Sequence, residues 1–246
     1  MSDLSGKRAL VTGAARGIGA AIARELATRG ADVAITYEKS ADAAAEVVNA
    51  VVVAGRKGFA IQADSADPVA VKRSVEEAVA ALGGLDILVN NAGVARVGPV
   101  EEMSLADIDA ILDVNVRGVV LASQAAIPHL GKGGRIITTG SNVATRVPFP
   151  GLTVYAMSKS ALLSFTQGLA RELGPKGVTV NLVHPGPVDT DMNPASGPLA
   201  DTMTATMAIP HYGKPDDIAK AVAFLASPDS SQITGTGILV DGGANA

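Results

Sequence analysis

Two side chains that could move a proton, Tyr155 and Lys159, stand four positions apart in a segment with the pattern of a helix. Residues at i and i+4 project from the same face of a helix. A phenol has an ordinary pKa of about 10, and a neighbouring ammonium group lowers it by favouring the phenolate. The pair therefore predicts a general acid or base that exchanges a proton with a carbinol oxygen. Taken alone, such a pair is more often part of a solvated helix surface.

Ser141 comes just after the predicted strand 134–139, where its hydroxyl could hold the oxygen of a carbonyl group. The sequence around it, GSNV, lacks the G-x-S-x-G pattern of a nucleophilic serine, so hydrolysis by a Ser-His-Asp triad is not predicted. The histidines are scattered, at His129, His184 and His211, and the chain has no cysteine. Because neither residue type shows metal-ligand spacing, we predict no metal site and interpret each histidine as structural.

A glycine-rich loop adds a second kind of chemistry, the binding of phosphate. The sequence TGAARGIG, from Thr12 to Gly19, joins a predicted strand to a predicted helix. Gly13 permits a tight turn, while Gly17 and Gly19 let the backbone approach a pyrophosphate, toward which the helix N-terminus directs free N–H groups. The spacing is G-x-x-x-G-x-G, so neither the common G-x-G-x-x-G pattern nor a P-loop is present. The alternative interpretation is a glycine-rich turn without a ligand.

Polar residues follow two further predicted strands. Asp64 and Ser65 come after 58–63, and the sequence NNAG, from Asn90 to Gly93, comes after 85–89. A carboxylate at a strand end can accept a hydrogen bond from an adenine amino group, although a helix N-cap before Pro68 and an ordinary Asn-Gly turn are the alternatives. Because open α/β sheets bind ligands at the carboxyl ends of their strands, three such ends together predict one binding site.

The elements that must position these residues alternate along the chain. Strands are predicted at 8–12, 32–37, 58–63, 85–89, 134–139, 178–183 and 237–240. Helices are predicted at 17–29, 41–54, 67–82, 104–130, 154–173 and 215–226. The strand segments are continuously apolar, which is typical of a parallel sheet covered on both faces. The pattern predicts βαβ units and an α/β fold.

Composition excludes several classes of protein. The chain has 246 residues, of which 48% are hydrophobic and 18% charged, so one large globular domain is expected. Its net charge of −4 argues against a nucleic-acid partner or an anionic membrane surface. No run of 18 apolar residues is present, so we expect no membrane span. The absence of cysteine suits a reducing compartment, and we expect a cytoplasmic protein.

From Lys7 to Gly243 the chain resembles the classical short-chain dehydrogenase/reductase family, and within it the carbonyl reductases that are similar to bacterial 3-oxoacyl-acyl-carrier-protein reductase. The resemblance rests on motifs in the family's order: TGxxxGIG at 12–19, NNAG at 90–93, Asn115, Ser141, YxxxK at 155–159 and Pro185-Gly186. It implies a single NAD(P)-binding domain over residues 1–246, a Rossmann-type doubly wound sheet of about seven parallel strands flanked by helices.

The resemblance also implies catalytic roles. Tyr155 would give the proton to the carbonyl oxygen, or remove it in the reverse reaction, and Lys159 would hold the nicotinamide ribose and lower the pKa of the phenol. Ser141 would orient the carbonyl group, and Asn115 would anchor a water that leads protons to Lys159. Ser141 and Tyr155 are 14 positions apart, one more than is usual in the family. The extra residue is expected in the loop 146–151, and Asn142 is an alternative that could share the role of Ser141.

Cofactor contacts follow from the same resemblance. Asp64 and Ser65 would meet the adenine, Asn91 would meet the adenosine ribose, and Thr190 would bind the nicotinamide carboxamide. The cofactor-binding set that we expect is Gly13, Arg16, Gly17, Ile18, Gly19, Thr36, Tyr37, Asp64, Ser65, Asn91, Ala92, Gly93, Tyr155, Lys159, Pro185, Gly186, Val188 and Thr190.

The end of the second strand favours NADP(H) over NAD(H). An acidic residue there would bind the ribose 2′-hydroxyl of NAD, but the matching positions are Thr36 and Tyr37. Arg16 can reach a 2′-phosphate, with Lys39 or Ser40 as helpers, although it could instead be ordinary surface charge. Glu38 would repel the phosphate if it pointed inward, so NAD(H) stays possible.

Substrate and partners are less constrained by the sequence. We expect a small carbonyl or alcohol substrate and an apolar lid over 191–212 that includes Met192, Met203 and Met207. The family resemblance implies a homotetramer formed through helices 104–130 and 154–173 and the last strand. The enzymatic alternatives are a 3-oxoacyl-acyl-carrier-protein reductase and an NAD-dependent alcohol dehydrogenase. Candidates for docking a carrier protein are Lys132, Arg171 and Lys176. A non-catalytic dinucleotide-sensing protein is the alternative from another class.

Overall fold

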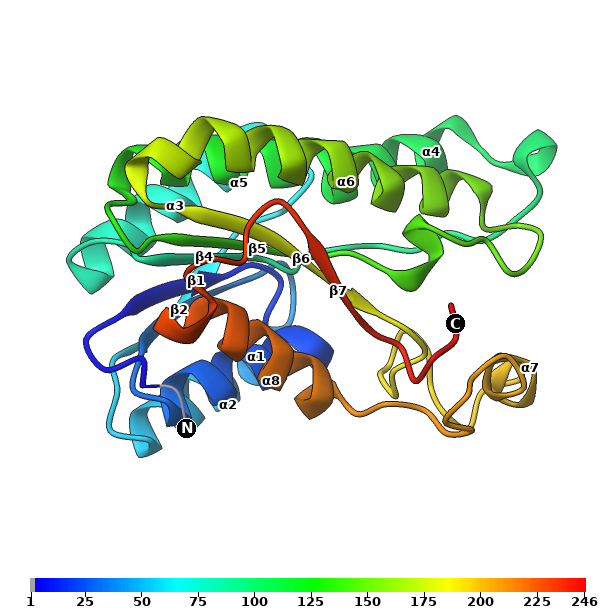
Figure 1. Ribbon diagram of the computed structural model, residues 1–246, viewed down its shortest axis with the longest axis horizontal. Helices are drawn as coiled ribbons and strands as arrows, with labels where there is room; N and C mark the ends of the chain where they lie inside the picture. The colour runs from blue at the N-terminus through cyan, green and yellow to red at the C-terminus, as the bar shows by residue number, and fades with distance from the viewer. Residues whose placement is uncertain (1–2) are drawn as a thin grey trace.

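A seven-stranded, fully parallel sheet with the order β3-β2-β1-β4-β5-β6-β7 forms the centre of the computed structural model, which describes residues 3–246 (Figure 1). The strands are β1 (Arg8–Val11), β2 (Asp32–Tyr37), β3 (Gly58–Gln62), β4 (Ile87–Asn90), β5 (Arg135–Thr139), β6 (Thr179–Pro185) and β7 (Gly237–Val240). The strand order changes direction between β1 and β4, which is the arrangement of a doubly wound sheet. The predicted single-domain Rossmann-type fold is therefore confirmed.

Helices cover both faces of this sheet, as Figure 1 shows. On one face lie α1 (Gly17–Thr28), α2 (Ala41–Val53) and α8 (Pro215–Ala226). On the other lie α3 (Pro68–Leu82), α4 (Leu105–Leu112), α5 (Val119–Ala126) and α6 (Thr153–Leu173). The short α7 (Ala200–Thr204) stands apart from both layers, near the C-terminus of the chain.

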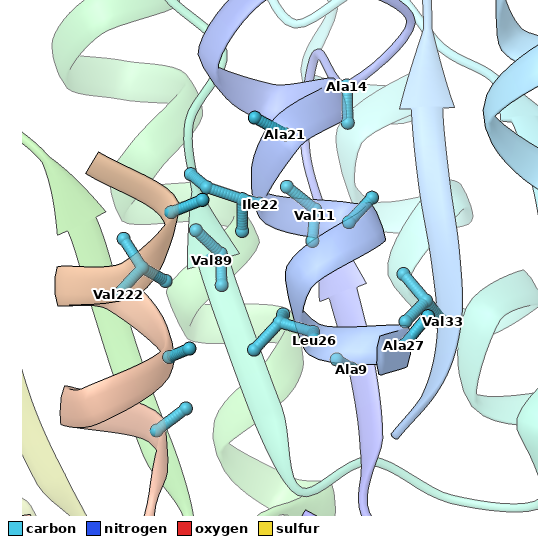
Figure 2. Packing of buried hydrophobic residues seen from close by; sticks show 14 of the residues in the cluster. Ala9, Val11, Ala14, Ala21, Ile22, Leu26, Ala27, Val33, Val89 and Val222 are labelled. Atoms are coloured by element: carbon cyan, nitrogen blue, oxygen red, sulfur yellow. The ribbon is translucent and has the colours of Figure 1, made fainter. Parts of the chain in front are cut away.

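Small residues bring α1 close to the sheet and to α8. Ile22 and Leu26 of α1 are fully buried, and they pack toward Val11 of β1, Val89 of β4 and Val222 of α8 (Figure 2). Each such side chain contributes about 1.5–3 kcal/mol by leaving water. This packing fixes the N-terminus of α1 directly after β1, where the glycine-rich loop lies.

The predicted elements agree with the observed bounds to within two residues, while α7 was not predicted and the helix predicted at 104–130 is interrupted. A π-helical turn (Asp113–Gly118) separates α4 from α5, and a 3-10 turn (Ile127–His129) ends the segment. π-turns occur most often at functional sites, and no simple sequence pattern announces them.

The combined segment Leu105–His129 is long and apolar enough to cross a membrane, with a mean hydropathy of 1.4. The sequence contains no run of 18 apolar residues here, so no membrane span was expected in this segment. In the structure its inner residues pack against α3, β4 and α6. This packing buries 39% of its most apolar window, and Leu105 and Val120 stay exposed.

Candidate functional site

The loop after β1 forms a narrow cradle at the carboxyl edge of the sheet. Gly13 has a φ of +62°, and a Cβ atom there would lie 2.8 Å from the Cα atom of Ala92 in the loop after β4. Gly17 has a φ of +56°, and its Cβ would lie 3.5 Å from Cγ2 of Thr190 in the loop after β6. A side chain at either position would occupy this cradle. Because both residues are glycines, the loop backbone stays accessible to an extended ligand that carries phosphate groups. Three predicted binding loops therefore meet, and they fit a dinucleotide.

Thr36 and Asn91 hold this cradle in shape. The N–H of Gly13 donates to Oγ1 of Thr36 over 3.0 Å, and the N–H of Ala14 donates to the Thr36 carbonyl over 2.9 Å. Nδ2 of Asn91 donates to the carbonyl oxygens of Thr12 and Gly13, over 3.0 and 3.1 Å. These side-chain groups were expected to contact the cofactor itself. In the structure they hydrogen-bond the loop that would receive it, and their contact with the cofactor stays a prediction.

Thr12 is a functional residue that the sequence analysis missed. Its Oγ1 accepts hydrogen bonds from the N–H groups of Asn91 and Ala92, over 3.0 and 3.1 Å. The hydroxyl thus joins the end of β1 to the loop after β4. The sequence feature that could have identified Thr12 is its position as the first residue of the glycine motif.

Ser65, Ala92 and Val114 line a small cavity of about 20 Å³ beside the cradle, together with the buried Thr36. Asp64 is exposed next to it and accepts from the N–H of Ala66 over 2.8 Å. Asp67, rather than Asp64, caps α3, by accepting from the N–H of Val69. Asp64 therefore does not serve as the helix cap and stays at the strand end.

Tyr37 lies away from that cavity. Its half-buried ring packs on the hydrophobic core under α1 and α2 and lines a groove with residues of α2 and β3. The phenol ring therefore belongs to the α2 side of the sheet. Its predicted contact with the cofactor is not supported by this placement.

Arg16 begins α1 as its N-cap residue, and its guanidinium group is exposed. The group lies 3.4 Å from the carboxylate of Asp191, at the start of the segment 191–212. Beyond β2, Lys39 pairs with Glu38 over 2.8 Å on the surface. The Glu38 carboxylate is thus balanced by a cation in the next residue.

Tyr155 and Ser141 meet across the site. Ser141 ends the loop after β5 and opens a 3-10 turn (Asn142–Ala144), where its Oγ accepts from the N–H of Val143 over 3.3 Å. Burial raises the pKa of Tyr155 above its ordinary value, and the nearby Ser141 hydroxyl opposes this only in part. The sequence predicted a lowered phenol pKa, so its direction was wrong in this structure, because burial is the largest effect. Ser141 is the residue that influences the phenol, and a shared role for Asn142 stays a prediction.

Lys159 is buried one helical turn further along α6. Its Nζ donates to the carbonyl oxygen of Thr139 over 3.0 Å and lies 6.0 Å from the centre of the Tyr155 ring. Burial lowers the pKa of this lysine to about 8. Gly93 stands beside it, since a Cβ there would lie 3.5 Å from Nζ.

Asn115 lies fully buried within the π-turn. Its carboxamide makes two hydrogen bonds with the backbone of Val94, each of 2.9 Å, and donates to Oγ of Ser158 over 3.1 Å. Asn115 therefore fixes the loop after β4 against α6. Without the family resemblance it would have been interpreted as an ordinary polar residue of a helix.

Thr190 completes the site from the β6 side. Gly186 follows β6 so closely that a Cβ there would lie 2.6 Å from the Cα atom of Asp241. This contact directs the chain back across the sheet edge to Val188, which is buried, and to Thr190 beside Gly17. Within residues 3–246, no group of three or more metal-ligating side chains is found.

Comparisons with known proteins agree with this geometry. Residues 13–245 match the family model described as "Enoyl-(Acyl carrier protein) reductase". The chain is 42% identical to a cyclic-di-GMP-binding biofilm dispersal mediator protein of Escherichia coli (strain K12), over 98% of each chain. It is 41% identical to 3-oxoacyl-acyl-carrier-protein reductase FabG of Staphylococcus aureus (strain Mu50), over 96% of this chain and 97% of the relative.

Among solved structures, a short chain dehydrogenase from Burkholderia cenocepacia J2315 in complex with NADP superposes with a TM-score of 0.98. It is 62% identical to this chain, and the match covers 99% of both. The family expected from the sequence motifs and the preference for NADP(H) both agree with this structure.

The buried lysine predicts an unusual pH dependence of stability. Its pKa is about 8 in the folded chain and 10.5 in its ordinary state, so between these values the unfolded chain binds more protons and stability rises with pH. Relative to Lys159→Met, the wild type should gain about 1.4 kcal/mol per pH unit over this range. Urea unfolding of the nucleotide-free proteins at several pH values measures the difference. Lys72→Met, which removes an exposed lysine, is the control, and parallel curves for wild type and Lys159→Met would contradict the prediction.

Proposed function

Because the chain belongs to the short-chain dehydrogenase/reductase family of oxidoreductases, we propose that it is an NADPH-dependent reductase of ketones or aldehydes. One observation carries the proposal: the Ser141 hydroxyl, the Tyr155 phenol and the buried Lys159 lie together where the loops after β1, β4 and β6 meet. This places a hydroxyl, a proton donor and a cation next to a cradle for a dinucleotide.

Bound NADPH would supply a hydride to the carbonyl carbon. Ser141 holds the carbonyl oxygen by hydrogen bonding, and the Tyr155 hydroxyl gives that oxygen its proton as the alcohol forms. The raised pKa of Tyr155 keeps the phenol protonated at neutral pH, which is the form that reduction requires. The ammonium group of Lys159 stabilises the phenolate that is left behind.

A preference for NADPH is supported by charge at the adenosine end. Arg16 is exposed at the start of α1 and can turn from Asp191 toward a 2′-phosphate, because an exposed ion pair of this kind contributes at most about 1 kcal/mol. Lys39 pairs with Glu38 and so reduces the repulsion that this carboxylate would exert on a phosphate. The cofactor-binding set remains that of the sequence motifs apart from Tyr37, whose ring lies on the α2 side of the sheet, and Thr36 and Asn91 also support the loop.

The segment 191–212 would act as a lid over the substrate. It contains α7, and its two ends are joined by a hydrogen bond from the Tyr212 hydroxyl to Oδ1 of Asn193, over 3.2 Å. Met207 is buried against the C-terminal Gly242, whereas Met192 is exposed. A lid of this kind excludes water and shapes an apolar pocket.

Reduction of a carrier-protein-bound 3-oxoacyl thioester is the nearest alternative, and FabG of Staphylococcus aureus is a relative with that name. The residues predicted to dock a carrier protein lie away from the carboxyl edge of the sheet, where the candidate site is. Lys132 and Lys176 precede β5 and β6, at the amino ends of the strands. Arg171 lies roughly 24 Å along α6 from Tyr155. These residues therefore do not support carrier-protein docking beside the site.

An NAD-dependent alcohol dehydrogenase would use the same side chains but prefer NAD(H). A non-catalytic dinucleotide-sensing protein would bind its ligand without turnover, and the relative from Escherichia coli carries cyclic-di-GMP binding in its name. The Ser141, Tyr155, Lys159 and Asn115 cluster favours catalysis, because sensing alone does not need a proton donor beside the cradle. We place the enzyme in the cytoplasm, acting on a small molecule without a nucleic-acid or membrane partner.

Replacing Tyr155 by Phe should lower kcat for carbonyl reduction about 10²–10⁴-fold, because the proton donor is lost. The dissociation constant for NADPH should stay within about twofold, since the ring remains. Steady-state turnover and fluorescence titration measure the two quantities. Tyr37→Phe, on the α2 side of the sheet, is the matched control and should retain turnover. A Tyr155→Phe enzyme of nearly wild-type kcat would refute the assignment.

Cofactor preference depends on Arg16 in this proposal. A charge-assisted hydrogen bond contributes about 1.5–3 kcal/mol, so NADPH should exceed NADH in kcat/KM by roughly 10–150-fold. Arg16→Ala should remove most of that margin and leave NADH kinetics nearly unchanged, because NADH has no 2′-phosphate. Arg24→Ala, further along α1, is the control. A wild-type enzyme that prefers NADH would contradict the proposal and point to Glu38 as a ribose ligand.

We propose that the protein assembles as a homotetramer through two faces. Leu105, Val120 and Met157 leave apolar surface exposed on α4, α5 and α6, and Phe224 and Leu239 do so on α8 and the edge strand β7. Two independent faces can produce a closed tetramer. Light scattering after size exclusion should give the tetramer mass, and Leu239→Asp should give dimers while Val53→Asp, on α2, should not. A monomeric wild type would refute the assembly.

A further inference from the structure

His184, near the end of β6, lies buried directly behind Ser141. Its Nδ1 is 2.9 Å from the Ser141 carbonyl oxygen. A carbonyl oxygen only accepts hydrogen bonds, so Nδ1 must carry the hydrogen and donate it. The interaction therefore selects the tautomer with hydrogen on Nδ1, although the sequence analysis interpreted this histidine as merely structural.

The backbone is built around this ring. A Cβ at Gly140 would lie 2.5 Å from Nδ1, and a Cβ at Gly237 on β7 would lie 2.5 Å from Cδ2. Because Gly140 and Gly237 have no side chains, the imidazole ring of His184 fits between them. Burial lowers the pKa of His184, as does the nearby Lys159, while Asp241 and the Ser141 bond raise it. The net lowering keeps the ring neutral, with its single hydrogen available for the Ser141 carbonyl.

Other hydrogen bonds also hold this loop and its turn. Nδ2 of Asn245 donates to the Asn142 carbonyl and Oγ of Ser160 to the Ala144 carbonyl, each over 2.6 Å, and Oγ of Ser141 accepts from the N–H of Val143 over 3.3 Å. The N–H of Gly140 donates to the carbonyl of Val183 over 2.8 Å, and Lys159 holds the carbonyl of Thr139. The Ser141 carbonyl also accepts from the N–H of Ala144 within its own turn, over 3.0 Å. His184 is thus the side chain that ties Ser141 itself to the sheet.

We propose that His184 is a positioning residue, which aims the Ser141 hydroxyl at the substrate carbonyl oxygen through this backbone bond. The inference rests on the proposed reductase function. Without the bond, the Ser141 backbone would lose its side-chain link to β6, and the Ser141 hydroxyl would shift from its place between phenol and substrate, although Asn245 and Ser160 still hold the turn. The chemical step should suffer, whereas the glycine-rich cradle for NADPH, which His184 does not contact, should not.

Two variants separate the hydrogen bond from the space that the ring fills. In His184→Asn, Nδ2 is attached to Cγ as Nδ1 is, so a donor can occupy the same place. His184→Leu fills a similar volume but offers no donor. The Leu variant should lose kcat at least tenfold with the NADPH dissociation constant within twofold, and the Asn variant should recover at least a third of wild-type kcat. His129→Leu, at a half-buried surface position, is the matched control.

A second measurement reads the tautomer in the unmodified protein and needs a variant only to identify the signal. Long-range proton–nitrogen NMR of protein labelled at histidine reports which ring nitrogen carries hydrogen, and His184→Asn identifies the signal. We expect His184 in the neutral form with hydrogen on Nδ1. Hydrogen on the other nitrogen would exclude the bond to Ser141 and overturn the inference.

The outcomes also separate this inference from the proposed function. A wild type that reduces no carbonyl compound would refute the reductase, whatever the tautomer. An active wild type whose Leu variant keeps its kcat, or whose Asn and Leu variants lose it equally, would refute the role of His184 alone. A kcat loss that follows the drop in melting temperature across all variants, the control included, would also refute it.

Discussion

The burial of one ammonium group constrains the rest of the site. Lys159 lies inside the protein, donates to the Thr139 carbonyl, and has a pKa of about 8. An ion in such a place is unfavourable unless other groups are arranged around it. Gly93 and Tyr155 occupy two of its sides, and Asn115 fixes the loop that carries Gly93. Burying this cation lowers the stability of the folded chain, which is expected at a site where a cation stabilises a phenolate.

Close approach of backbone segments is the second constraint, and it depends on particular glycines. Gly13 lets the first loop touch Ala92, Gly186 lets the end of β6 pass Asp241, and Gly140 makes room for His184. Small buried residues of α1 and α8 likewise let these two helices pack closely on one face of the sheet. The loops that would bind a dinucleotide are therefore fixed by contacts between backbones, with Thr12, Thr36 and Asn91 as the side chains that join them.

The sequence predicted the architecture well because buried parallel strands and amphipathic helices have strong local patterns. It also selected Ser141, Tyr155 and Lys159, which the structure brings together. It could not give the contacts that the tertiary structure decides. Thr36 and Asn91, predicted to contact the cofactor, also hydrogen-bond the glycine-rich loop, and the ring of Tyr37 packs under α2. The phenol pKa moved opposite to the prediction because burial cannot be judged from spacing. The π-turn around Asn115 and the ring of His184 behind Ser141 left no pattern in the chain.

The central claim is that this site transfers a hydride from NADPH to a carbonyl carbon with Tyr155 as proton donor. The most direct test follows the absorbance of NADPH and of NADH while the enzyme meets a panel of ketones, aldehydes and 3-oxoacyl thioesters. We expect oxidation of NADPH that depends on a carbonyl compound, is faster than that of NADH, and yields one alcohol for each nucleotide consumed. Tight nucleotide binding with no carbonyl-dependent oxidation across the panel would contradict the claim and leave the dinucleotide-sensing protein as the better explanation.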